Sequence, residues 1–322
     1  MSVALFEKIY EFATSPRRLC AASILRIGVA TLTAVLYLMH LHQRSFMWGI
    51  HGQTEFSFYA AAVKPGPLTL YAISGNAIWP ELLFWVGLFA SIVYMLGVFP
   101  RITSIVFFAL TASLYSRNAM ALDGGQNLLI LLAFYLCFAD SGAYFSLTRD
   151  SAAAHTCSRI AAPSAPALHV LHNLAMFVIA GQICMVYYWS GFYKISGHKW
   201  QDGTAVYYVM RANEFAFPPL SHFIYQNAFA VTFLTYSTLV FQGAFPFLMW
   251  VRRAKPFLLL AAFGFHAGIA IFMGLVFFSA MMIVADLSVF SDTFYAELGE
   301  RVRRIAARVR RLRASSEACA AT

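Results

Sequence analysis

The chain has 322 residues, of which 60% are hydrophobic and only 11% are charged. A water-soluble globular protein is about half apolar and about a quarter charged. The composition therefore excludes an ordinary soluble fold and predicts an all-α integral membrane protein with no sizeable soluble domain. The net charge of +9 does not indicate nucleic-acid binding, because many basic residues lie in one tail, Arg301 to Arg313.

The first half of the chain contains apolar stretches long enough to cross a membrane. They follow a short N-terminal segment, residues 1–18, and cover residues 19–41, 81–99, 102–118 and 126–144. Residues 42–80 are of mixed polarity, and we expect them to form a loop with an interfacial or re-entrant piece.

The second half contains two similar stretches, residues 168–189 and 228–250, and then a long apolar run over residues 257–290. As one helix this run would be about 50 Å long, whereas the hydrocarbon core of a membrane is about 30 Å thick. We therefore expect a break near Met273 and Gly274. The result is about eight transmembrane helices in a domain that covers residues 19–290.

The distribution of basic residues tests this helix count. With the N-terminus in the cytoplasm, eight spans place sixteen lysines and arginines inside and six outside. Seven spans would place nine inside and thirteen outside, against the usual excess of positive charge in cytoplasmic segments. We therefore predict a multi-pass protein of the cell (inner) membrane with both termini cytoplasmic. The basic tail, residues 291–322, is expected to contact anionic membrane lipids.

Ionisable side chains inside a membrane are costly and are therefore candidates for function. Arg26 in the first span and Asp286 in the last are expected at similar depth, which allows a structural ion pair, and Asp140 competes for the same arginine. His266 in the seventh span is either a hydrogen-bonded core residue or a catalytic group. Small residues in the spans are expected to let helices approach closely; among them are Gly28, Gly87, Gly97, Gly181, Gly191 and Gly268.

A richer polar cluster is expected at the outer end of the fifth span. Lys194 follows a run of aromatic residues and precedes His198 and Trp200. Lys194 is either an interfacial anchor or a desolvated amine that acts as a general base. We take Lys194, His198 and His266 as candidate catalytic residues, with Trp200 as a candidate substrate-binding residue.

A second polar group is expected at the outer turn between the third and fourth spans. Its candidate substrate- or cofactor-binding residues are Arg117, Asp123, Gln126 and Asn127. Gly124 and Gly125 allow a ligand to approach the backbone, but paired glycines also simply form turns. The sequence contains no metal-binding spacing, Walker loop, nucleophile elbow or dinucleotide fingerprint.

Four stretches resemble the HTTM (horizontally transferred transmembrane) domain family, which is related to vitamin K-dependent gamma-carboxylase. They are SILRIGVATL (23–32), NLLILLAFYLCFADSGAYFSL (127–147), YYWSGFYKISGHKWQDGTAV (187–206) and FHAGIAIFMGLVFFSAMMI (265–283). The resemblance implies that Lys194 is the base that deprotonates a reduced quinone of the vitamin K type, at the extracytoplasmic face. In the carboxylase, oxygen then adds, and the strong base that results removes a proton from a peptidyl glutamate.

Two departures argue against a full glutamate carboxylase. The carboxylase has a histidine near the start of the second of these stretches, where this chain has Gly124 or Gly125. A large extramembrane domain that binds substrate propeptides is also missing. The sequence therefore looks more similar to compact bacterial members of the family, such as sporulation-delaying protein B.

Three functions remain open at this stage. The first is a membrane enzyme that uses a quinol to modify a peptide or lipid. The second is a non-catalytic membrane factor for the maturation or export of a secreted peptide, and the third is a small-molecule transporter. The polar groups gather at the outer ends of spans rather than at the midplane, which favours the enzyme over the transporter.

Overall fold

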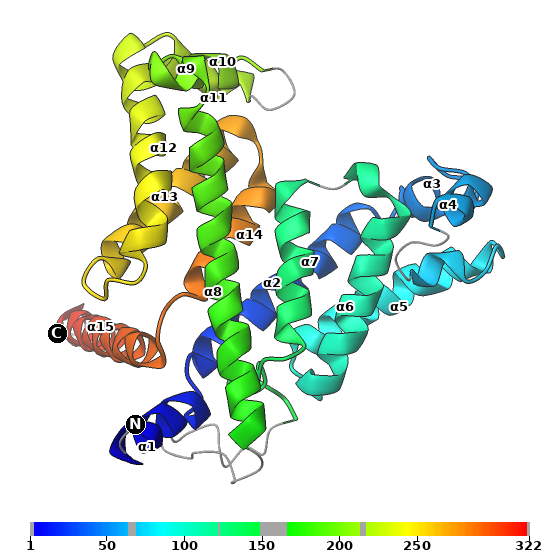
Figure 1. Ribbon diagram of the computed structural model, residues 1–322. Coiled ribbons are helices and arrows are strands. Elements are labelled where there is room, and N and C mark those ends of the chain that lie inside the picture. Colours follow the sequence, from blue (N-terminus) through cyan, green and yellow to red (C-terminus); the bar gives the residue numbers. More distant parts are fainter. Residues whose placement is uncertain (1–2, 64–68, 122, 149–165, 213–216, 321–322) are drawn as a thin grey trace.

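The computed structural model describes residues 3–63, 69–121, 123–148, 166–212 and 217–320, and most of these residues are helical (Figure 1). Within these ranges there is no β-strand, and only an isolated bridge joins His51 to Glu55. The all-helical prediction is therefore confirmed. It follows from the apolar sequence, since a backbone in lipid must satisfy its own hydrogen bonds.

The first half of the molecule is built around α2, which packs against α5 and α7, while α6 packs between α5 and α7. Its helices are α1 (Val3–Thr14), α2 (Leu19–Met39), α3 (Arg44–Trp48), α4 (Phe56–Val63), η1 (Leu70–Ala72), α5 (Ile78–Met95), α6 (Pro100–Arg117), η2 (Ala119–Ala121) and α7 (Gly124–Leu136).

The second half is built around α8, which stands near the centre of the molecule and packs against α12 (Figure 1). Its helices are α8 (Pro166–Ile195), α9 (His198–Gln201), α10 (Ala205–Val209), α11 (Pro218–Tyr225), α12 (Ala228–Leu248), α13 (Lys255–Met273), α14 (Val276–Leu287) and α15 (Asp292–Ala320). Helix α14 joins the two halves, because it packs against α13 on one side and against α2 and α7 on the other.

Each of the apolar stretches forms a helix, but their lengths differ. In the described part of the chain, five helices are long and apolar enough to cross a membrane, namely those that contain α2, α5, α8, α12 and α13. A sixth crossing is formed if α14 and the start of α15, which meet at 105°, make one broken span. Helices α7 and α14 have 13 and 12 residues, which is about 20 and 18 Å of rise. Eight full-length spans are therefore not confirmed.

The break in the last apolar run falls where the sequence predicts it. Helix α13 ends at Met273, and α14 begins at Val276. Gly274 caps α13 with a φ of +69°, a left-handed conformation that glycine adopts without a steric penalty.

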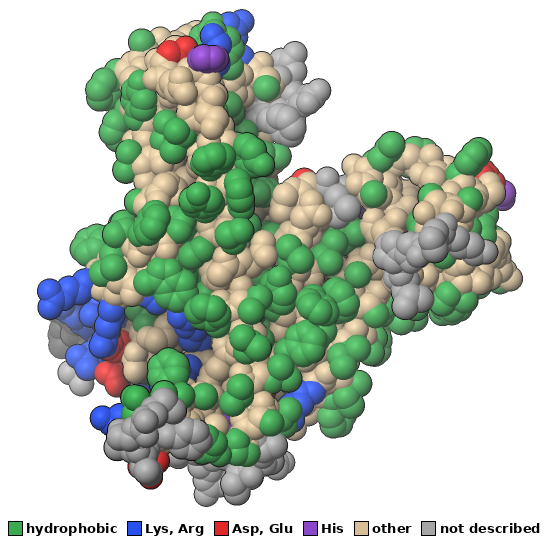
Figure 2. Space-filling view, in the orientation of Figure 1, with side chains coloured by type: hydrophobic (Ala, Val, Ile, Leu, Met, Phe, Trp, Pro, Cys, Tyr) green, Lys and Arg blue, Asp and Glu red, His purple; other side chains and the backbone are tan. Residues whose placement is uncertain are grey.

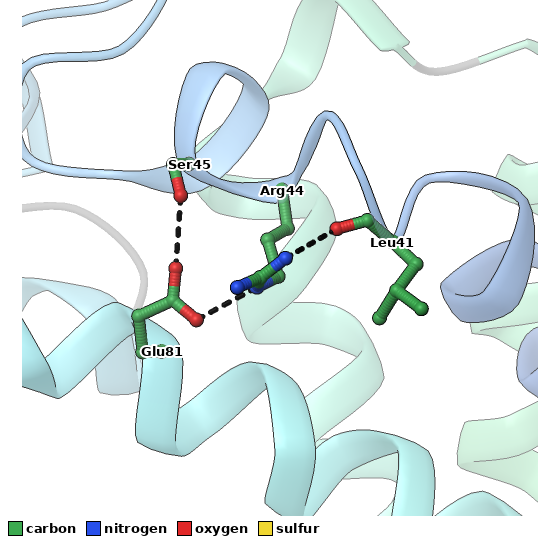
Figure 3. A network of polar contacts seen from close by, with 4 residues as sticks. All are labelled: Leu41, Arg44, Ser45 and Glu81. Atoms are coloured by element: carbon green, nitrogen blue, oxygen red, sulfur yellow. Dashed lines mark hydrogen bonds and ion pairs between the residues drawn. The ribbon is translucent and has the colours of Figure 1, made fainter.

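The segment between the first two spans contains short helices held against α5. In Figure 3, Arg44 Nε donates to Glu81 Oε2 at 2.7 Å, and Ser45 Oγ donates to Glu81 Oε1 at 2.9 Å. Arg44 also donates to the carbonyl of Leu41 at 2.6 Å. These bonds fix the chain as it leaves α2 to the first turn of α5.

Several glycines make the predicted close contacts. A Cβ at Gly28 would lie 2.3 Å from Val284 of α14, and a Cβ at Gly87 would lie 2.1 Å from the hydroxyl of Tyr37. Gly97 and Gly191 are also tightly packed. The prediction is wrong for Gly181 and Gly268, whose Cβ positions have no neighbour within 4 Å.

The predicted ion pair between Arg26 and Asp286 is not formed. The Arg26 side chain is fully buried, and its Nη1 donates to the carbonyl of Ser141 at 2.9 Å while its Nη2 donates to the carbonyl of Phe145. Arg26 forms no ion pair with Asp140 either. The chain that leaves α7 passes beside α2, so its carbonyls reach the guanidinium before any carboxylate does.

Both termini lie at one end of the molecule, and α9, α10 and α11 lie at the other (Figure 1). Figure 2 shows lysine and arginine side chains gathered at the terminus end, near α15. The exposed basic residues there include Arg252, Arg253, Arg301, Arg303 and Arg304.

Candidate functional site

A cavity of 490 Å³ lies between α8, α12, α13 and α14, at the end of the bundle opposite the termini. Most of its lining is apolar and comes from residues such as Phe265, Phe272, Phe278 and Met282. Its polar lining consists of a few side chains, Tyr187, Ser190, Lys194, Trp200, Thr238, Gln242 and His266. Apolar walls with a few polar groups are typical of a site for a small organic molecule.

One face of α8 supplies three of these polar groups. Tyr187, Ser190 and Lys194 stand three, four and seven positions apart, so successive turns of the helix point them to the same side. Sequence reasoning included Lys194 but missed Tyr187 and Ser190. The i, i+3, i+7 spacing of polar groups in an apolar helix is the signal that would have found them.

The Lys194 amine is held by a neutral group. Its Nζ donates to Ser190 Oγ at 2.6 Å and lies 5.4 Å from the centre of the Trp200 ring. Among the described residues, no carboxylate forms an ion pair with it. An amine without a carboxylate partner is not locked in its charged form and remains able to exchange a proton.

The neighbouring lysine has a different environment. Lys199 is exposed, and its Nζ donates to the hydroxyl of Tyr208 at 3.1 Å. This hydrogen bond raises the pKa of Lys199, so its amine stays protonated. His198, a predicted catalytic residue, is exposed at the start of α9 and does not line the cavity. The structure therefore separates Lys194 from its two basic neighbours in the sequence.

Two further polar groups face the cavity with unused hydrogen-bonding atoms. Gln242 of α12 and His266 of α13 are 4% and 1% exposed. Gln242 Oε1 and His266 Nδ1 have no hydrogen-bond partner among the residues that the structure describes. Buried polar atoms are nearly always hydrogen-bonded, so these atoms point to a ligand or to ordered water. Gln242 was missed because an isolated glutamine in an apolar helix has no distinctive spacing.

Behind the cavity wall, Tyr187 links His266 to Asp286. The Tyr187 hydroxyl donates to Asp286 Oδ2 at 2.8 Å and lies 2.9 Å from His266 Nε2. The Tyr187 ring stacks on Phe245 with centroids 3.8 Å apart, which fixes its position. Asp286 thus belongs to the cavity's polar network rather than to Arg26.

A groove on the outer surface of α12 and α13 adjoins the cavity. This groove has a volume of 940 Å³ and is lined mostly by apolar side chains. It shares four lining residues with the cavity, Leu234, Thr238, Gly264 and Phe265. Both helices are long and apolar enough to cross a membrane.

The second predicted group of binding residues lies outside the cavity. Arg117 is buried at the end of α6, where its Nη2 donates to the carbonyls of Gly49 and Thr54. Asp123 and Gln126 form a capping box at the start of α7. Asn127 is exposed on that helix. These side chains hold a loop and a helix end, and the structure does not bring them to Lys194.

Comparison with known proteins gives one family. The model of the HTTM domain matches residues 21–293. A relative, protein YitO of Bacillus subtilis (strain 168), is 28% identical over 264 residues, which cover 79% of this chain and 80% of YitO. No solved structure gives a significant match.

Proposed function

The chain belongs to the HTTM domain family, and we propose that it is a membrane enzyme that uses a lipid-soluble quinol to modify a peptide or lipid at the extracytoplasmic face. The observation that carries this proposal is the position of Lys194. Its amine has no carboxylate partner in the described part of the chain and lines a cavity enclosed by apolar helices. The family's relation to vitamin K-dependent gamma-carboxylase motivates the choice of a quinol.

The cavity fits a quinol in size and in chemistry. A volume of 490 Å³ falls within the range of about 300–1,000 Å³ that is usual for small-molecule sites. The aromatic wall formed by Trp200 and Phe278 suits a planar ring. The unpartnered Oε1 of Gln242 accepts hydrogen bonds, as a quinol hydroxyl requires.

The neighbouring groove supports a lipid-soluble substrate. It adjoins the cavity between α12 and α13 and faces the membrane, so a hydrocarbon tail can remain in lipid while its polar head reaches Lys194. A water-soluble substrate would not need an opening toward the membrane.

Each polar residue receives a role in this proposal. Lys194 accepts a proton from a ligand hydroxyl at Nζ, and Ser190 orients the amine. Gln242 and His266 bind and orient the ligand through their free atoms. A bound quinol would supply a weakly acidic hydroxyl and two reducing electrons. The apolar walls keep bulk water away from the amine and from the ligand hydroxyl.

The site test compares Lys194→Met with Lys194→Arg in the purified full chain. The probe is menadiol, with binding followed by tryptophan fluorescence and oxygen consumption by an electrode. Wild type should bind menadiol and consume oxygen. Both variants should still bind it but lose oxygen consumption, because neither methionine nor arginine can serve as a base near neutral pH.

Two outcomes would contradict the proposal. If menadiol does not bind, the quinol is the wrong ligand, and a factor for peptide maturation or export or a transporter becomes the better interpretation. If Lys194→Arg keeps full oxygen consumption, the lysine is only a positive anchor. Lys199→Met is the matched control and should leave both measurements unchanged, since Lys199 is exposed outside the cavity.

The groove provides a second test. A Cβ at Gly264 would have no neighbour within 4 Å, so Gly264→Leu should fold while it narrows the opening between α12 and α13. We expect weaker binding of a quinol with a decyl tail and unchanged binding of tailless menadiol. Equal loss for both probes would mean that the groove does not admit the tail.

We further propose that the eight predicted helices all act as spans of the cell membrane, with both termini cytoplasmic and the cavity at the opposite face. The clustering of basic residues at the terminus end supports this orientation (Figure 2). Single cysteines at the exposed positions Ser196 and Thr293, in a cysteine-free background, test it. In intact cells a membrane-impermeant thiol reagent should label Ser196→Cys but not Thr293→Cys, and the reverse result would invert the orientation.

A further inference from the structure

Three buried side chains from three helices form a hydrogen-bonded chain beneath the cavity. His266 of α13, Tyr187 of α8 and Asp286 of α14 are each at most 2% exposed. Tyr187 Oη lies 2.9 Å from His266 Nε2 and 2.8 Å from Asp286 Oδ2. Because the hydroxyl both accepts and donates, a proton can enter at one end of this chain as another leaves at the other end.

Each end of this row of three hydrogen-bonded side chains carries an atom that is free to form a further hydrogen bond. In the described ranges of the chain, His266 Nδ1 and Asp286 Oδ1 have no hydrogen-bond partner. His266 lines the Lys194 cavity, whereas Asp286 lines a second cavity on its other side. Each of these two atoms thus lies at a place where an incoming or outgoing proton could bind beside a cavity.

The second cavity lies toward the terminus end of the molecule. Its volume is 10 Å³, about the space that one water molecule needs. It is lined by Asp286 and by Lys255, the first residue of α13. Lys255 precedes His266 by eleven positions, which is about 16 Å along the helix and about half of the hydrocarbon core.

We propose that His266, Tyr187 and Asp286 form a proton relay between the Lys194 cavity and the terminus end of the protein. This inference deepens the proposed function, since a base in a lipid-enclosed cavity needs an exit for the proton that it takes from its substrate. The geometry of the relay itself does not depend on which substrate is bound.

The transfer balances without electrons or a co-reactant. A proton binds His266 Nδ1, the proton on Nε2 passes to Tyr187 Oη, and the tyrosine proton passes to Asp286 Oδ2. The carboxyl group then rotates and releases the proton to water beside Lys255. The imidazole turns to restore the starting state, so His266, Tyr187 and Asp286 each regain their original charge.

Hydrogen–deuterium exchange of the Asp286 carboxyl group tests the relay without any substrate. The full chain is reconstituted in lipid at a pH low enough to protonate Asp286, and the infrared carbonyl band is assigned by its loss in Asp286→Asn. After transfer to D₂O the band should shift quickly in wild type, because the carboxyl group communicates with a cavity on each side.

One substitution closes the proton route from Asp286 to the Lys194 cavity, and another closes the route from Asp286 to the small cavity beside Lys255. Tyr187→Phe removes the hydroxyl but keeps the ring stacked on Phe245, and Ala262→Val fills the small cavity. Each single variant should exchange at nearly the wild-type rate, and the double variant about tenfold more slowly. Tyr115→Phe, which removes a buried hydroxyl in the other half, is the matched control and should have no effect.

Any other pattern of exchange rates among these variants contradicts the proton relay. If the double variant exchanges as fast as wild type, neither route carries protons. If one single variant is as slow as the double variant, the other route is closed and the two cavities are not connected. Should Ala262→Val fail to fold, Leu259→Phe fills the same cavity from a half-buried position. Failure of menadiol binding would refute the quinol but not this result.

Discussion

In the half of the molecule built from α2 to α7, the buried arginines Arg26 and Arg117 each donate two hydrogen bonds to backbone carbonyls. In the half built from α8 to α14, Lys194, Gln242 and His266 line a cavity. Buried atoms without a hydrogen-bond partner occur in both halves, at Arg26 and Arg117 as at Gln242 and His266, so the cavity is what distinguishes the second half. The first arrangement fixes loops to helices. The second leaves polar groups available for a ligand, which shows that an ionisable group in a membrane is not by itself a functional one.

The same contrast appears in the glycines. Gly28 and Gly87 lie where another helix allows no side chain, and both are in the first half. Gly243, Gly264 and Gly268 are in the second half, on α12 and α13, and open space lies where their Cβ atoms would be. The tightest glycine contacts thus lie in the first half, whereas the second half holds both open positions and packed ones such as Gly191.

The largest effect on stability is expected from Arg26→Leu. It removes the Arg26 donor from the carbonyl of Phe145 and from that of Ser141, which keeps Ser23 Oγ as its remaining donor, at about 1–3 kcal/mol for each lost hydrogen bond. Chemical unfolding in detergent should show a loss of about 3 kcal/mol. Arg252→Leu, at an exposed position, is the control and should change little. A loss no greater than that of the control would remove the structural role of Arg26.

A smaller effect is expected from Gly28→Ala. The new methyl would lie 2.3 Å from Val284 Cγ1, and such overpacking costs about 1–3 kcal/mol. The matched change Gly181→Ala meets no neighbour within 4 Å and should stabilise α8 by up to about 1 kcal/mol. Adding Val284→Ala to Gly28→Ala should restore part of the stability. If Gly28→Ala and Gly181→Ala behave alike in thermal unfolding, α2 and α14 are not in close contact.

The helix cap of α7 should contribute about 1 kcal/mol, which Asp123→Ala would remove. Asp123→Ser keeps a side-chain oxygen for the backbone amides of Gly125 and Gln126 and should keep most of this stability. In both variants, menadiol binding and oxygen consumption should decrease only as far as the folded protein is lost. Loss of menadiol binding in a stable Asp123→Ser protein would instead restore the ligand-binding role that the sequence predicts for this residue.

The smallest effect on stability is expected from Lys194→Met. The amine bonds only to Ser190, so its loss should change the unfolding free energy by less than about 1 kcal/mol. Oxygen consumption with menadiol should nevertheless be lost. A destabilisation as large as that of Arg26→Leu would mean that Lys194 is a structural anchor like the arginines of the first half.

Sequence reasoning went furthest where local chemistry decides the structure. The apolar stretches form helices, and the last run breaks at Gly274. Sequence reasoning went less far in counting spans, because apolar length does not tell how deeply a 13-residue helix such as α7 enters the membrane. For the site, it named Lys194 and His266, which line one cavity in the structure, but it did not separate them from Arg117, which lies outside that cavity.

The sequence by itself determined that this protein suits a membrane, that it is helical, and roughly where its long helices lie. It could do so because hydrophobicity, proline and glycine act on residues that are close in the chain. Only the tertiary structure decided the partners of the buried polar groups. Tyr187 meets His266 and Asp286 across 79 and 99 positions of the chain, and Arg26 meets Ser141 across 115. Such partners depend on which helix faces pack together, and all of these helices carry similar apolar patterns.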